Sequence, residues 1–138
     1  MKWLAMVVAI GFVAACSDES VFGVPQYSSV RPFDVVLAPG EEILVDGVYG
    51  IAFTGVTEDS RCAVDVVCIW QGNAAVAIGL TVGKGPTHPF TLNTGVEPYR
   101  VEHAGYRVRL LSLSPQPVST APIEQKRYRA RLHVEAVR

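Results

Sequence analysis

The stretch Ala74–Val82, with the sequence AAVAIGLTV, decides the fold of this chain. Its larger aliphatic side chains alternate with small or polar ones, as they do in a β-strand that has one buried face. The run Gly83-Lys84-Gly85-Pro86 ends the pattern, because glycine and proline interrupt regular structure. The stretch therefore predicts a strand with one inward-facing row. That row is Ala74, Val76, Ile78, Leu80 and Val82.

The same two-residue period recurs on both sides of this strand. It predicts strands at Phe33–Leu37, 43–45, 49–54, 90–92, around Val101, and at 106–113 and 128–137. The Asp46-Gly47 pair is typical of a hairpin turn, and a phase shift between Leu110 and Leu111 indicates a β-bulge. No segment keeps a helical period over a useful length. About eight strands separated by turns predict an all-β domain, either an antiparallel β-sandwich or a small barrel.

The N-terminus carries a pattern of a different kind. Lys2 is followed by an uncharged apolar run over residues 3–13, and small residues then lead directly into Cys16. The apolar run is shorter than the ~20 residues that a membrane-spanning helix needs. These residues resemble a bacterial lipoprotein signal peptide with its lipobox. The resemblance implies cleavage before Cys16, which would carry palmitate-type acyl chains. Cleavage by the ordinary signal peptidase after Ala15 is the alternative.

This resemblance divides the chain into three parts and implies a location. Residues 1–15 would be the cleaved signal peptide, residues 16–30 a lipidated tether, and residues 31–138 the β-domain. A flexible tether of this length reaches roughly 20 Å, so the domain is expected close to the lipid bilayer. Ser17 follows the cysteine. By resemblance to the sorting rule of enteric bacteria, the absence of Asp there favours the outer membrane over the inner one.

Composition restricts the class of partner. Removing residues 1–15 takes away only Lys2 among the charges, which leaves 11 basic and 13 acidic side chains and a net charge of −2. A nearly neutral net charge does not indicate a nucleic-acid partner. The length suits one domain, and no cofactor is indicated.

The cysteines predict one disulfide. Of the three cysteines, Cys16 is assigned to lipid, which leaves Cys62 and Cys68 as a pair in an exported chain. The spacing of these two residues differs from that of redox-exchange motifs. The bridge is therefore expected to fix a local loop.

The densest group of unusual residues runs from residue 58 to residue 74 and includes both of these cysteines. It resembles a recurrent pattern in small uncharacterised bacterial exported proteins and lipoproteins, D-S-R-C-P-x-x-V-x-C-x-W-x-G-x-A. The matching positions are Asp59, Ser60, Arg61, Cys62, Val66, Cys68, Trp70, Gly72 and Ala74. Ala63 replaces the usual proline. The resemblance implies a β-rich exported domain and no particular activity.

Two interpretations of this segment are open. Its loop can be purely structural, or it can present Asp59, Arg61, Asp65 and Trp70 to an envelope protein or polysaccharide, because rigid loops on β-scaffolds often bind and Trp and Arg are frequent anchors. Arg61 is expected to pair with Asp59 or Asp65, or to lie across an aromatic face. The sequence thus predicts a non-enzymatic binding module. A structural spacer in the envelope is one alternative.

An enzyme is the other alternative. Glu58, Asp59 and Asp65 offer oxygen ligands but lack the spacing of a calcium loop. Cys62 and Cys68 would need His88 or His103 to bind a soft metal, and an oxidising compartment favours the disulfide. No nucleophile-elbow or metalloprotease motif occurs. An enzyme would therefore be a small envelope hydrolase or metal-dependent enzyme without a readable motif.

Arginines recur at every second position within the predicted strand at 106–113, and just before and within the one at 128–137. They are Arg107, Arg109, Arg127, Arg129 and Arg131. On neighbouring strands they would form a basic stripe able to contact anionic envelope polymers or lipid headgroups. The simpler interpretation is a solvated polar face that Glu102, Glu124 and Glu135 balance.

Overall fold

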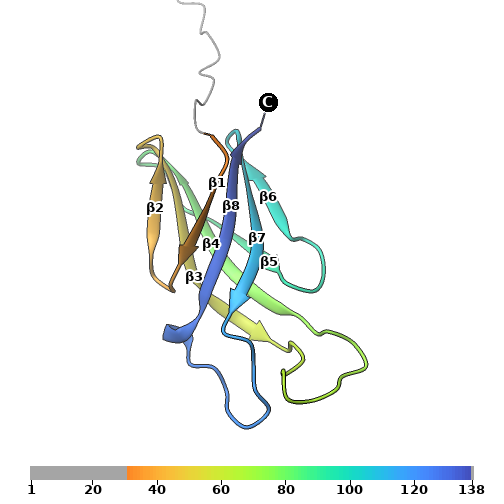
Figure 1. Cartoon of the computed structure of the whole chain (residues 1–138). Coiled ribbons are helices and arrows are strands. Elements are labelled where there is room, and N and C mark those ends of the chain that lie inside the picture. Colours follow the sequence, from red (N-terminus) through yellow and green to blue (C-terminus); the bar gives the residue numbers. More distant parts are fainter. Residues whose placement is uncertain (1–30, 138) are drawn as a thin grey trace, which may run out of the picture.

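The computed structural model describes residues 31–137 and confirms the all-β class. Eight strands in this part of the chain form two four-stranded antiparallel sheets, in the orders β1-β8-β7-β6 and β2-β3-β4-β5 (Figure 1). The strands are β1 (Phe33–Leu37), β2 (Glu42–Val45), β3 (Tyr49–Asp59), β4 (Ala74–Val82), β5 (His88–Asn93), β6 (Arg100–His103), β7 (Tyr106–Ser114) and β8 (Arg129–Ala136). The predicted signal peptide, the predicted lipidation of Cys16 and the predicted tether lie outside the described residues.

The core lies between the inner faces of the two sheets, as in a β-sandwich. Four residues of the predicted β4 row, from Ala74 to Leu80, are buried there. They belong to one apolar cluster with Val108, Leu132 and Val134 of the other sheet. The fifth residue departs from the prediction, since Val82 is 46% exposed. It is the last residue of its strand, immediately before the turn at Gly83, where the buried face ends.

The predicted turn at Asp46-Gly47 and the predicted bulge also form. The β2–β3 connection has left-handed backbone at Asp46 and Gly47, and the β6–β7 connection has it at Ala104 and Gly105. Such pairs are typical of the type I′ turns that match the twist of a hairpin. The pairing of β7 with β8 shifts register between Leu110 and Ser112, which confirms the bulge.

One predicted strand begins later than expected. A 3₁₀ turn, η1 (Gln125–Arg127), precedes β8, which starts at Arg129. Arg127 therefore leaves the predicted stripe of five arginines. Residues 125–127 are all polar and exposed, so they lack the alternation of buried and exposed side chains that is typical of a strand. This alternation starts only at Tyr128.

The two ends of the sandwich carry different segments of the chain. β1 begins and β8 finishes at the same end, at the top of Figure 1. The 60–73 loop between β3 and β4 and the 115–128 segment between β7 and β8 lie at the opposite end. Residues 31–137 contain no helix that is long and apolar enough to cross a membrane.

Candidate functional site

The base of the 60–73 loop contains an ion pair between Arg61 and Asp59. The Arg61 Nε atom lies 2.8 Å from Oδ1 of Asp59, and Nη2 lies 2.7 Å from Oδ2. The two side chains are only 8% and 12% exposed. This fork-to-fork geometry is the strongest form of an arginine–carboxylate contact. It confirms the first of the three contacts expected for Arg61.

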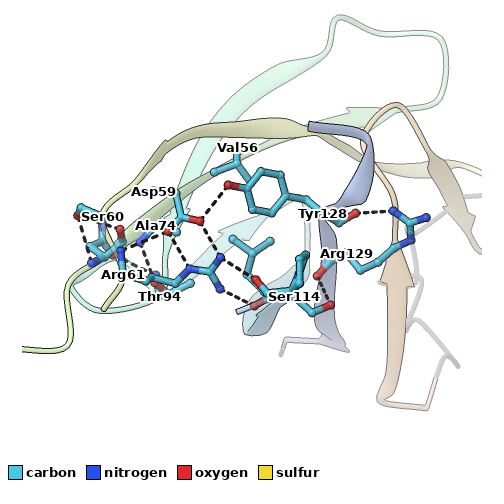
Figure 2. Close-up of polar contacts among 12 residues, drawn as sticks. Val56, Asp59, Ser60, Arg61, Ala74, Thr94, Ser114, Tyr128 and Arg129 are labelled. Carbon is cyan, nitrogen blue, oxygen red and sulfur yellow. Dashed lines mark hydrogen bonds and ion pairs between the residues drawn. The ribbon is translucent and has the colours of Figure 1, made fainter. Parts of the chain in front are cut away.

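The same guanidinium group joins the loop to the other sheet (Figure 2). Its Nη1 atom donates to the Leu113 carbonyl at 2.6 Å, and Nη2 donates to the Pro115 carbonyl at 2.9 Å. Tyr128, just before β8, donates its hydroxyl to Oδ2 of Asp59 at 2.9 Å. Arg61 and Asp59 therefore connect the end of β3 to both ends of the 115–128 segment. We call these two residues the clamp.

Protonation properties of the clamp follow from its contacts. Burial by itself would raise the pKa of the Asp59 carboxyl, but hydrogen bonds from Arg61 and Tyr128 outweigh it, and the pKa lies below its usual value. Burial, followed by the bond to Asp59, raises the pKa of the Tyr128 hydroxyl. The carboxylate is charged and fully engaged at neutral pH. The structure thus places Arg61 and Asp59 inside the base of the loop, where a partner would reach little of either side chain.

Asp65 lies apart from the clamp and holds the outer part of the loop. Its carboxylate accepts a hydrogen bond from the Ser119 amide at 2.8 Å and another from the Ser119 hydroxyl. The hydroxyl bond, followed by the amide bond, lowers the pKa of Asp65. The amide of neighbouring Val64 donates to the Pro117 carbonyl at 3.0 Å. The 60–73 loop and the 115–128 segment are therefore joined twice, at the clamp and at Asp65.

The Cys62–Cys68 disulfide is present as expected. The bridge encloses residues 63–67, and these form, with residues 68–70 that follow, a tip, residues 63–70, that is apolar and exposed. Val67 and Ile69 are fully exposed, at 101% and 107%, and Trp70 is 60% exposed. Val64 and Val66 are exposed as well. The one charged residue of the tip, Asp65, is already bound to Ser119. Clustered exposed apolar side chains mark interaction surfaces.

Several residues that build this site were not singled out from the sequence. Asn73 accepts hydrogen bonds from the amides of Thr94 and Gly95 at 3.2 and 2.9 Å, and donates to Asn93 at 2.9 Å. Ser119 and Tyr128 bind the two aspartates. An asparagine directly before a strong strand is a local signal for such a role. The partners of Ser119 and Tyr128, in contrast, are far away in sequence.

The outer face of the β1-β8-β7-β6 sheet shows how its charges are balanced. Arg107 pairs with Glu102 and with Glu135, at 2.5 and 2.6 Å. Arg131 and His133 both bind Asp34. Much of the predicted stripe is therefore a balanced polar face. The described residues also contain no group of three or more His, Cys, Asp or Glu side chains that could hold a metal ion.

Comparison with known proteins gives no relative for this chain. No protein-family model, curated protein or solved structure matches it. A proposal about its function therefore depends on its own residues and geometry.

Proposed function

We propose that this chain is a lipid-anchored protein of the bacterial envelope that acts as a binding module and contacts a partner protein through the apolar tip, residues 63–70. The observation that carries the proposal is the exposure of Val67 inside the disulfide loop and of Ile69 and Trp70 directly after it. Folded proteins rarely leave such a cluster uncovered without a use for it. Tryptophan is also among the residues that contribute most to binding energy in protein interfaces.

The rigidity of the tip supports the same proposal. The disulfide closes the loop, the bonds of Asp65 and Val64 attach it to the 115–128 segment, and the clamp fixes its base. A surface that is already ordered loses less conformational entropy when it binds. In this role Arg61 and Asp59 are positioning residues, and Trp70 is the contact residue.

The chemistry of the tip favours a protein over a polysaccharide as its partner. Valine and isoleucine side chains bury well against apolar protein surface and offer no hydrogen bonds to sugar hydroxyl groups. The tip also lies at the end of the sandwich opposite to the start of β1 (Figure 1). A chain anchored through Cys16 would therefore direct the tip away from the membrane that holds it.

The proposed location depends on the N-terminal pattern and on the cysteines. The lipobox resemblance at Cys16 supports a lipid anchor, and Ser17 after it supports the outer membrane. A disulfide persists in an oxidising compartment such as the periplasm or the cell surface.

Crosslinking in intact cells, followed by affinity purification and mass spectrometry, tests the proposal. We expect the wild type to capture one envelope protein in near-stoichiometric yield and Trp70→Ala to lose it. Leu44→Ala is the matched control, because it removes an exposed apolar side chain from β2, outside the tip. Unchanged circular dichroism spectra would show that both variants are folded. Capture retained by Trp70→Ala, or equal loss with Leu44→Ala, would overturn the proposal.

A further inference from the structure

A pocket of about 430 Å³ lies beside the clamp and is separate from the apolar tip. The residue that follows β5, the connection to β6, and the bulged part of β7 form its walls. Its lining residues include Arg109, Tyr99, Ser112, Gln116, Asn93 and Thr94. The volume falls within the range of small-molecule sites, roughly 300–1,000 Å³.

Arg109 supplies this pocket with a positive charge that no carboxylate balances. Within residues 31–137 it has no ion pair, whereas Arg107, two positions earlier, has two. Its direct neighbour on β6 is Arg100, which carries the same charge. Its direct neighbour on β8 is His133. Like charges placed directly opposite each other on a sheet destabilise it. An anion bound at Arg109 would relieve this repulsion.

The rest of the lining strengthens the preference for an anion. None of the lining residues carries a carboxylate. Arg61 contributes to the wall, but Asp59 already neutralises its charge. The side chains of Tyr99, Ser112 and Gln116 make no hydrogen bonds to other described residues. The pocket thus combines one free guanidinium group with several free hydroxyl and amide groups.

We propose that this pocket binds a carboxylate-bearing sugar unit of an acidic polysaccharide. The planar guanidinium group of Arg109 would hold the carboxylate by two parallel hydrogen bonds. Hydroxyl and amide groups of Ser112, Gln116 and Tyr99 would bind the sugar hydroxyl groups. The exposed side chain of Leu111 in the wall offers apolar surface to the C–H face of the ring.

Titration of the full-length protein with trigalacturonate, followed by NMR chemical shifts, tests this inference. We expect saturable binding of trigalacturonate and at least tenfold weaker binding of its methyl ester, which has the same rings without the charges. Arg109→Gln should weaken trigalacturonate binding at least tenfold. Arg127→Gln is the matched control, because it removes an exposed arginine outside the lining, and it should change the affinity less than twofold.

Each other outcome contradicts the inference in a defined way. Equal binding of the ester would show that the carboxylate is not recognised. Displacement of trigalacturonate by an equal concentration of inorganic phosphate would indicate a simple anion site without sugar recognition. Equal weakening by Arg109→Gln and Arg127→Gln would indicate unspecific charge attraction. Trp70→Ala should leave saccharide binding unchanged, so this site and the proposed protein contact can fail separately.

Discussion

Gly72 shows at the scale of a single residue why the 60–73 loop needs its sequence. Its φ is +72°, in the left-handed region. A Cβ atom at this position would lie 1.9 Å from the Ser60 carbonyl oxygen and 2.8 Å from the Arg61 Cα atom. The end of the loop therefore passes against the backbone at its beginning, directly beside the clamp. Only glycine fits both the conformation and the space.

Gly72→Ala is expected to destabilise the protein more than a left-handed glycine alone would explain. The matched control is Gly83→Ala, whose φ is +56° but whose Cβ would have no atom within 4 Å. Gly83→Ala should cost about 1–2 kcal/mol from backbone strain, and Gly72→Ala should cost about 2 kcal/mol more from overlap with backbone. Urea unfolding measures both. Equal losses of stability would contradict the close approach at Gly72.

The contacts of Arg61 mark a limit of sequence-based prediction at the residue scale. Its pairing with Asp59, two positions away, was one of the expected contacts and is confirmed. Its bonds to the carbonyls of Leu113 and Pro115 join residues 52 and 54 positions apart. No local pattern marks a carbonyl oxygen as a distant acceptor. The burial of Arg61 depends on these distant contacts between the two sheets, so it could not be predicted from the local sequence.

At the scale of elements, alternation of side chains predicted where the strands lie but not how far all of them extend. β3 runs to Asp59, beyond the predicted end at residue 54. Its outer half contains Gly55, Glu58 and Asp59, residue types that are uncommon in strands. Two register shifts against β4 interrupt the regular alternation there. This irregular half of β3 positions Asp59 in the clamp. The predicted end of the strand was therefore wrong at the place where the candidate site is built.

The clamp joins elements, and its loss should destabilise the protein strongly. Arg61→Ala leaves the Asp59 carboxylate in a largely buried position without its partner, which typically costs about 3–5 kcal/mol. Urea unfolding measures this loss. Hydrogen exchange should also accelerate at two amides of the loop. The Cys62 amide donates to the Gln71 carbonyl within the loop, and the Val64 amide donates to the Pro117 carbonyl outside it.

Arg127→Ala serves as the control for the clamp variant. Arg127 lies in η1 and is exposed, so its removal should change stability by no more than about 0.5 kcal/mol. A loss below about 1 kcal/mol for Arg61→Ala would show that the clamp is dispensable to the fold.

At the scale of the whole molecule, the two ends of the sandwich are closed by different means. At the end where β1 begins, Tyr49 is buried and stacks on Tyr106 with ring centroids 4.5 Å apart. Burial, followed by the proximity of Tyr106, raises the pKa of Tyr49 to about 12. The Tyr106 hydroxyl also donates a hydrogen bond to the Asp46 carboxylate at 2.5 Å, so this end combines aromatic packing with one engaged carboxylate. The opposite end contains the clamp, whose charged carboxylate is largely buried, so acid should weaken this end as the carboxylate takes up a proton.

The pH dependence of stability should therefore reveal the clamp. The folded pKa of Asp59 lies below its value of about 3.9 in the unfolded chain. Its stabilising effect is complete above that unfolded value and is lost as the pH falls through the folded pKa. Asp59→Asn should cost about 3 kcal/mol at pH 7, because Arg61 loses its counter-charge.

The difference in unfolding free energy between wild type and Asp59→Asn should narrow as the pH falls below about 4, when the wild-type carboxyl also takes up its proton. Urea unfolding at a series of pH values from about 2 to 7 measures this. Asp65→Asn is the control. Its carboxylate also has a lowered pKa but is exposed, so solvent screens its bonds and its effect should be smaller. A difference for Asp59→Asn that stays constant with pH would mean that the charge of Asp59 does not stabilise this end of the sandwich.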